Sequence, residues 1–194
     1  YNALIDKHPD GAYTKDDAVE ISALFMFLNR TCFNGLYRVN KENHFNVPFG
    51  KYKNPPIDQS NQIRENARAL ENVPSLIIAR ASYEDSLPLA GENAFFYLDP
   101  PYRPLPGSPS FTAYAKSGFN DDDQRSLAEY CRALDAAGAK FMLSNSDPHN
   151  TDPEDDFFDE LYDGFTIERV GATRAINSKG DGRGKINEIL VRNF

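Results

Sequence analysis

Two short apolar runs flank an amphipathic stretch in the second half of the chain, and this order limits the folds that the chain can adopt. Residues 94–99 (AFFYLD) and 139–145 (AKFMLSN) have the length and composition of buried strands. Residues 121–138 begin with three aspartates, carry apolar side chains at i, i+4 and i+7, and end in glycine, as a helix does. This order of strand, helix and strand predicts an α/β fold with a sheet that is parallel in its middle.

Three further strands are expected around this unit. Residues 165–170 (FTIERV) and 186–194 (INEILVRNF) are apolar runs joined by a loop without helical pattern. Such a connection predicts an antiparallel hairpin at one edge of the sheet. Residues 75–81 (SLIIARA) form another short apolar run, which we also expect to be a strand.

The first part of the chain has a different pattern. Residues 15–30 and 58–72 show the spacing of helices. Between them, residues 33–54 mix aromatic, Asn, Gly and basic residues without a helical period. This composition predicts a hairpin or long loop with a short β element.

Acidic and basic residues are concentrated in different segments of this chain of 194 residues, whose net charge is −8. Residues 146–163 hold eight acidic residues and no lysine or arginine. Residues 30–53 hold five basic residues against one acidic residue, and residues 169–192 hold six against two, so each segment has a net charge of +4. The pattern fits basic surfaces that bind nucleic acid, and it equally fits charged faces that are merely solvated.

The cysteines and the hydropathy favour a reducing, cytoplasmic setting. The two cysteines, Cys32 and Cys131, are far apart in the sequence and form no metal-type spacing. No apolar run approaches the ~18 residues that span a bilayer, and no signal peptide is visible. We therefore expect a cytoplasmic protein with reduced thiols and no membrane partner.

The strand expected at 94–99 ends in Asp99-Pro100-Pro101-Tyr102. Ligands of open α/β sheets bind beyond the carboxyl ends of strands, where this tetrapeptide lies. Two prolines stiffen the backbone and leave carbonyl oxygens without partners, so a carboxylate and a carbonyl form two adjacent acceptors. The exocyclic amino group of a base has two N–H donors, and the Tyr102 ring offers a stacking face. A plain strand-to-turn exit is the alternative, because Asp-Pro also favours turns.

Two acceptors on an amino group favour attack by adenine N6 on a methyl group. The N6 lone pair is delocalised into the ring, and acceptors that hold both hydrogens favour a pyramidal nitrogen with an available lone pair. A base inside a duplex does not reach such a pocket, so it has to be flipped out. The transfer needs an electrophilic methyl group and no activated water, so no metal is expected.

Several stretches resemble DNA adenine methyltransferases of the Dam type, the D12 class of amino-methyltransferases with a DPPY motif. Residues 99–102 are similar to their catalytic motif, and residues 28–55 (LNRTCFNGLYRVNKENHFNVPFGKYKNP) closely resemble their target-recognition segment. The resemblance covers about residues 18–194. Further similar stretches follow in the order of the family: SYEDS (82–86), FTAY (111–114), SNSD (144–147) and GRGKINEIL (182–190).

The resemblance implies a Rossmann-like methyltransferase sheet, dependent on S-adenosylmethionine and with its N-terminal part absent, and a small DNA-recognition domain. Residues 1–73 would be the target-recognition domain, and residues 74–194 the C-terminal part of the catalytic domain. The family carries a glycine-rich cofactor loop and an acidic residue for the ribose before the recognition segment, and neither is found here. We therefore expect a fragment of a longer enzyme, since the chain starts at Tyr1 rather than Met. A naturally short chain, either a DNA-binding remnant or one half of a split enzyme, is the alternative.

Carried over by motif, Asp99 and Pro100 would hold the adenine amine, Pro101 completes the motif, and Tyr102 would stack on the base. Asp99 would also face the cofactor.

Tyr83 would lie near the adenine of S-adenosylmethionine, with Ser82 beside it. A place in the core is the alternative for Tyr83.

The resemblance also implies a set of DNA-binding residues in the recognition segment and near the C-terminus. Phe33 and Asn34 match the pair that enters the duplex near the flipped base. Arg38 matches a base-reading position, and an arginine that binds a guanine edge is what major-groove chemistry predicts; a plain surface charge is the alternative. The full set is Phe33, Asn34, Leu36, Arg38, Asn46, Pro48, Lys51 and Tyr52, with Arg174, Asn177 and Arg183 as weaker candidates for backbone contacts.

The resulting prediction is a site-specific DNA adenine-N6 methyltransferase that acts on duplex DNA, commonly at GATC, in restriction-modification or post-replicative marking. We expect a monomer. If the chain is truncated, an exposed sheet edge could cause copies of it to associate. Methylation of RNA or of a protein glutamine amide is an alternative, but those families usually carry Asn at the position of Asp99. A sequence-specific DNA-binding protein without catalysis is the alternative from another class.

Overall fold

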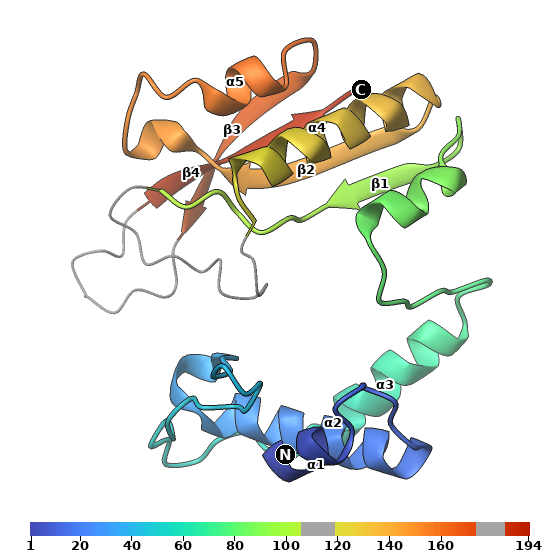
Figure 1. Ribbon diagram of the computed structural model, residues 1–194, viewed down its shortest axis with the longest axis vertical. Helices are drawn as coiled ribbons and strands as arrows, with labels where there is room; N and C mark the ends of the chain where they lie inside the picture. Colours follow the sequence, from blue (N-terminus) through green and yellow to red (C-terminus); the bar gives the residue numbers. More distant parts are fainter. Residues whose placement is uncertain (106–118, 174–184) are drawn as a thin grey trace. The chain divides into compact units, whose positions relative to one another are not determined.

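The computed structural model describes residues 1–105, 119–173 and 185–194, which fall into two compact units. Unit 1 is Tyr1–Ala79, drawn in blue to teal in Figure 1, and unit 2 is Arg80–Phe194, drawn in green to red. None of the helices in these ranges is long and apolar enough to cross a bilayer. The sequence resemblance predicted a division of the chain after residue 73 into a target-recognition part and a catalytic part. These two roles stay predictions.

Unit 2 contains a sheet of four strands in the order β1-β2-β4-β3. β1 and β2 are parallel and helix α4 lies between them in the sequence, as the pattern of strand, helix and strand predicted. β3 pairs with β4 in antiparallel orientation at the other edge, which confirms the expected hairpin. The parallel pair was expected in the middle of the sheet, and it lies at an edge because β4 pairs antiparallel with β2. The bounds are β1 (Phe95–Leu98), β2 (Lys140–Ser146), β3 (Thr166–Thr173), β4 (Lys185–Arg192) and α4 (Asp121–Ala136).

Sequence signals fix both ends of α4. The Asn120 side chain accepts hydrogen bonds from the backbone N–H groups of Asp122 and Asp123, and the Asp123 side chain accepts one from the Asn120 N–H. This is a capping box, and the acidic residues of the first turn also favour the positive end of the helix dipole. Beyond the helix, Gly138 has a φ of 80°, a left-handed conformation that side chains other than glycine rarely adopt.

The core of unit 2 lies on one face of the sheet, under α4 and the short helix α5 (Phe157–Leu161) (Figure 1). On β1, residues of the other face are open: Phe95 is 56 % exposed and Tyr97 is 58 % exposed. Asp99 follows Tyr97 by two residues and is exposed as well. The buried core comprises Leu127, Ala128, Tyr130, Cys131, Leu134, Ala139, Phe141, Leu143, Phe158, Tyr162, Ile189 and Val191.

Unit 1 consists of three α-helices and an irregular loop. The helices are α1 (Asn2–Lys7), α2 (Lys15–Thr31) and α3 (Ser60–Glu71), and the last two confirm the helices expected at 15–30 and 58–72. Thr14 caps α2, because its side chain accepts a hydrogen bond from the backbone N–H of Asp17. The loop between α2 and α3 contains two isolated antiparallel bridges, so the hairpin-like segment with a short β element is confirmed.

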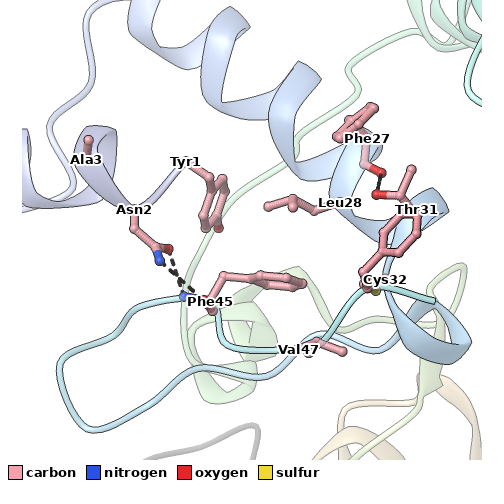
Figure 2. A pocket seen from close by; sticks show the side chains of 10 residues that line it. Tyr1, Asn2, Ala3, Phe27, Leu28, Thr31, Cys32, Phe45 and Val47 are labelled. Atoms are coloured by element: carbon pink, nitrogen blue, oxygen red, sulfur yellow. Dashed lines mark hydrogen bonds between the residues drawn. The ribbon is translucent and has the colours of Figure 1, made fainter. Parts of the chain in front are cut away.

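An apolar pocket of about 730 Å³ lies between α1, α2 and this loop (Figure 2). Phe45 closes it from the loop side, where its backbone N–H and carbonyl bond the Asn2 side chain at 2.8 and 3.2 Å. Phe49 also lines the pocket but is 64 % exposed, so it does not fill a core. The small apolar interior of unit 1 therefore includes Phe45, together with Tyr1, Leu28, Cys32 and Val47.

The prediction of a strand at residues 75–81 is wrong. These residues form an irregular connection, in which Ile77 is 77 % exposed and Ile78 is 80 % exposed. A strand exists only where its backbone pairs with a neighbour, and no described strand lies in register with this segment. The apolar composition was read correctly, but composition alone does not supply a pairing partner.

Candidate active site and recognition surface

Asp99 directly follows β1 at the carboxyl end of the parallel pair. The register of β1 and β2 pairs Leu98 with Leu143, which brings the next residues, Asp99 and Ser144, together. The buried Ser144 hydroxyl donates to Oδ1 of Asp99 at 3.2 Å, and no described residue donates to Oδ2. Asp99 therefore has one oxygen bonded to Ser144 of β2 and one oxygen, on an exposed carboxylate, to which none of the described residues donates.

Tyr102 is half-buried next to the same strand ends. Its hydroxyl donates to Oε2 of Glu188 on β4 at 3.3 Å. Burial raises the pKa of Tyr102, and the charges of Glu188 and Asp99 raise it further, although a hydrogen bond with Ser144 opposes them. The phenol stays neutral and its ring is tethered, which suits a stacking face; its role toward a base stays a prediction.

Arg103 fastens the chain just after the motif. Its guanidinium donates to both carboxylate oxygens of Asp121 at 2.9 and 3.2 Å and to Asp155 at 2.7 Å, and it stacks on the Phe157 ring at 4.2 Å. Burial opposes the charge, but the bonds and charges of the two aspartates outweigh it and raise the pKa of Arg103. The sequence reasoning missed this residue, because its two carboxylates lie far along the chain.

Ser82 and Tyr83 begin the 3₁₀ helix η2 (Tyr83–Leu89). Ser82 is its cap, since the Asp85 side chain accepts the Ser82 N–H at 3.0 Å and Ser82 takes part in a capping box. The ring of Tyr83 packs edge-on against Tyr130 with centroids 5.0 Å apart, and it is half-buried against the core. Part of the Tyr83 ring thus packs in the core, as the alternative for this residue expected. The role of Ser82 and Tyr83 in binding the cofactor stays a prediction.

In unit 1, a tight turn presents Phe33 and Asn34. Asn34 has a φ of 54°, and Gly35 follows with a φ of 61°. The Phe33 N–H donates to the Pro48 carbonyl at 2.8 Å, and the Asn34 N–H donates to the Tyr52 hydroxyl at 3.0 Å. Both side chains are exposed, Phe33 by 50 %, on a backbone that Pro48 and Tyr52 of the same loop hold in place.

Gly50 allows Tyr52 to reach this turn. A Cβ at Gly50 would overlap the Tyr52 ring and lie 2.6 Å from the Cys32 carbonyl oxygen, so no larger residue fits without a shift of backbone. The Gly50 N–H donates to the Thr31 carbonyl at 2.8 Å, which ties the loop to the end of α2. Lys51 is exposed beside it, with a φ of 56°.

Arg38 and Asn46 face each other across the hairpin. Asn46 Oδ1 accepts from Arg38 Nε at 2.8 Å, the Asn46 carbonyl accepts from Arg38 Nη2 at 2.9 Å, and the Asn46 N–H donates to the Arg38 carbonyl at 3.1 Å. Both residues are exposed. The structure thus joins two predicted DNA-binding residues and orients the guanidinium by a neutral partner that leaves its charge uncompensated.

The remaining predicted DNA-binding residues fall into two groups. Pro48 is exposed, whereas Leu36 is half-buried and its carbonyl accepts a hydrogen bond from the Cys32 thiol at 3.2 Å. Three predicted residues, Arg174, Asn177 and Arg183, lie outside the described residues.

Ion pairing differs between the basic and acidic segments. In the described part of the chain, none of the lysines and arginines of 30–53 forms a salt bridge, whereas the His44 ring pairs with Asp6 at 2.6 Å. The acidic segment 146–163, in contrast, is partly neutralised within unit 2: Arg169 pairs with Asp147 and Asp159, and Arg103 pairs with Asp155. Accessible charge is therefore concentrated more in the basic loop than the sequence totals suggest.

One group of side chains in the described residues has the spacing of a metal site. His149, Asp156 and Asp159 offer ligand atoms within 4.8 Å of one another. The Arg169 guanidinium already donates to Asp159 at 2.6 Å, and a cation at this distance competes with a metal ion for the carboxylate. The expectation of chemistry without a metal stays a prediction.

Comparison with known proteins identifies the class. The sequence profile of the D12 class N6 adenine-specific DNA methyltransferases matches residues 6–176, and the chain belongs to this family. The chain is 48 % identical over 179 residues to the Type II methyltransferase M.MjaIII of Methanocaldococcus jannaschii, which covers 92 % of the chain and 59 % of the relative.

Two other relatives extend this likeness. The Type II methyltransferase M1.LlaDCHI of Lactococcus lactis subsp. cremoris is 40 % identical over 194 residues, which are 100 % of the chain and 66 % of the relative. The DNA adenine methylase of Escherichia coli (strain K12) is 34 % identical over 175 residues, 90 % of the chain and 59 % of the relative. The chain thus spans 59 to 66 % of the length of these curated relatives.

Proposed function

We propose that this protein takes part in the transfer of a methyl group from S-adenosylmethionine to N6 of a flipped adenine in duplex DNA, with GATC as the target sequence. The carrying observation is the exposed Asp99 carboxylate at the carboxyl end of β1, beside the rigid Pro100-Pro101 backbone. Membership of an adenine-specific DNA methyltransferase family supports the substrate class.

In the proposed reaction, Asp99 and the Pro100 carbonyl accept the two hydrogens of the adenine amine. This holds N6 in a pyramidal geometry with its lone pair directed at the methyl group. Oδ2 of Asp99, to which no residue of the described chain donates, is the proposed acceptor on the carboxylate, since Ser144 donates to Oδ1. Once N6 gains the methyl group it releases one proton, and the Asp99 carboxylate is the adjacent group that can take it.

When bound, S-adenosylmethionine supplies an electrophilic methyl group. The fit of the residues present is partial: the half-buried Tyr83 ring offers an apolar surface for an adenine, and Asp99 offers an accessible oxygen. No glycine-rich loop for the cofactor is found in the sequence. We therefore assign to this chain the binding of the target amine and part of the cofactor contact.

Recognition of the DNA is proposed for the loop of unit 1. Arg38 would bind a guanine edge, while Phe33 and Asn34 would enter the duplex beside the flipped base. The exposed side chains, and the absence of salt bridges for the lysines and arginines described in 30–53, support this assignment. Lys51 would bind phosphate, and Tyr52 would act by holding the backbone of the turn as well as by flanking it.

The test is product analysis by mass spectrometry after incubation with S-adenosylmethionine and a duplex that contains one GATC site. The expected result is N6-methyladenine in this duplex and none in a duplex of the same composition with the site scrambled. Methylation of both duplexes would contradict the GATC assignment, and DNA binding without any methylation would favour a DNA-binding protein without catalysis.

A further inference from the structure

Two buried amide side chains lie directly beneath the tetrapeptide of the candidate active site. Gln124 is in α4 and Asn145 is in β2, and both are completely buried. Buried amides are costly unless their donors and acceptors are paired. Their hydrogen bonds therefore indicate what these residues are placed to hold.

The two amides form a chain of hydrogen bonds that ends on both sides of Tyr102. Gln124 Nε2 donates to the Pro101 carbonyl at 3.1 Å, and Asn145 Nδ2 donates to Gln124 Oε1 at 3.1 Å. Asn145 Oδ1 in turn accepts the Arg103 N–H at 2.9 Å. The residue before Tyr102 and the residue after it are thus fixed to the core by one connected network.

Amides satisfy this network at any pH. The Pro101 carbonyl accepts but does not donate, so Gln124 has to present its NH₂ group there and its oxygen to Asn145. Asn145 then has to present its NH₂ group to Gln124 and its oxygen to the Arg103 N–H. An ionised carboxylate at position 124 would place an oxygen against the Pro101 carbonyl with no proton between them.

The network also distinguishes the two proline carbonyls. The Pro101 carbonyl is occupied by Gln124, whereas the Pro100 carbonyl accepts no hydrogen bond from any described residue. Ser146 strengthens the same anchor, since its hydroxyl donates to the Arg103 carbonyl at 2.6 Å. Within the described ranges, Asp99 Oδ2 and the Pro100 carbonyl are therefore acceptors at the end of β1 that no donor occupies.

We propose that Gln124 and Asn145 are positioning residues for the methyl transfer: together they hold Pro101 and Arg103 so that the acceptors on Asp99 and Pro100 keep the geometry that an amino group requires. This rests on the proposed function. Neither residue touches the base or the cofactor. Their effect is expected in the rate of transfer more than in DNA affinity, because they order groups that act on the reacting amine.

The first experiment compares Gln124→Met with Gln62→Met, which replaces an exposed glutamine of α3 in unit 1. Hydrogen exchange of the Arg103 amide is measured by NMR, and single-turnover methyl transfer and DNA affinity are measured on the same samples. For Gln124→Met we expect amide exchange about tenfold faster or more and a transfer rate about 10- to 100-fold lower. DNA affinity should stay within about twofold of the unsubstituted protein, and Gln62→Met should change none of these quantities.

The second variant, Gln124→Glu, adds a pH signature that a loss of folding does not mimic. The new carboxyl is buried against a carbonyl, so its pKa is raised, and it can donate to Pro101 only while protonated. Transfer should therefore be retained at low pH and lost as the pH rises through that raised pKa. The unsubstituted protein and Gln124→Met should lack this transition.

The outcomes separate the two proposals. Unchanged exchange in Gln124→Met, or faster exchange with an unchanged transfer rate, overturns the positioning role. A Gln124→Glu profile identical to that of the unsubstituted protein also overturns it. If the unsubstituted protein transfers no methyl group, the proposed function fails, and the exchange measurement alone still decides whether the amide pair holds the tetrapeptide.

Discussion

Arg38 and Arg103 show how differently two parts of the molecule use the same side chain. Arg38, on the hairpin of unit 1, is exposed and bonds only to the neutral Asn46. Arg103, behind the candidate active site, is 20 % exposed and bonds to Asp121 and Asp155. An arginine bonded to an amide still has an uncompensated charge that can bind an anion or a base from outside. An arginine bonded to two carboxylates is neutralised within the fold.

The largest effect is expected from removing the internal arginine. Arg103→Ala leaves two carboxylates without their partner and exposes the Phe157 ring on which the guanidinium stacks. We expect the free energy of unfolding of unit 2 to fall by about 2–4 kcal/mol, measured by urea denaturation. Arg125→Ala is the matched control: Arg125 also lies over the Phe157 ring, at 5.2 Å, but it is 56 % exposed and pairs with an exposed aspartate at 3.4 Å. A similar loss in both variants would contradict the structural role of Arg103.

Removal of the exposed Arg38 side chain should weaken sequence discrimination in DNA binding and leave the free energy of unfolding unchanged. Arg38→Ala is expected to cost roughly 1–3 kcal/mol of discrimination at one base pair. The measurement is binding to duplexes with each single substitution in the target site. An equal loss on every sequence would show that Arg38 contacts phosphate, and a fall in unfolding free energy would show that it is a structural residue like Arg103.

Asn46→Asp gives Arg38 a carboxylate partner, as Arg103 has. The new carboxylate would pair with Arg38 and neutralise it, so DNA binding should weaken and the slope of log K against log salt should fall by about one. Asn66→Asp, on an exposed position of α3, adds the same charge without touching Arg38. If both variants weaken binding equally, net charge decides the effect and the pairing does not.

The smallest effect concerns acid stability in unit 1. Hydrogen bonds from Lys7 and Thr14 hold the pKa of Asp17 down at about 2. Because this lies below the value of about 3.9 for an unfolded chain, the stabilisation is complete above about pH 4 and is lost as the pH falls toward 2. Thermal unfolding of Asp17→Asn should be less pH-dependent in this window than that of the parent, and Asp16→Asn, at an exposed neighbouring position, should resemble the parent.

Local signals explain what the sequence could predict. Apolar spacing placed α2, α3 and α4, and aspartates and a glycine marked the two ends of α4. The chain between β3 and β4 was too poor in helical pattern for a parallel connection. Asp99 could be placed at a strand end because an apolar strand and its terminating prolines are contiguous in the sequence. Such features depend on neighbouring residues, which a sequence displays directly.

Long-range pairing explains what could not be predicted. Residues 75–81 have strand composition, but no partner strand lies beside them in the described chain, so they stay irregular and exposed. Gln124 and Asn145 reach Pro101 and Arg103 only after α4 has packed on β2. A polar Gln124 among the buried positions of α4 was the one available signal, and it showed burial without showing its partner.

The central claim is that Asp99 acts on the reacting amine while the loop of unit 1 binds DNA. The most direct test measures methyl transfer and DNA affinity on Asp99→Ala in parallel with the unsubstituted protein. We predict a loss of transfer of at least about 100-fold, with DNA affinity kept within about twofold. Transfer that survives in Asp99→Ala, or a loss of affinity as large as the loss of transfer, would contradict the account.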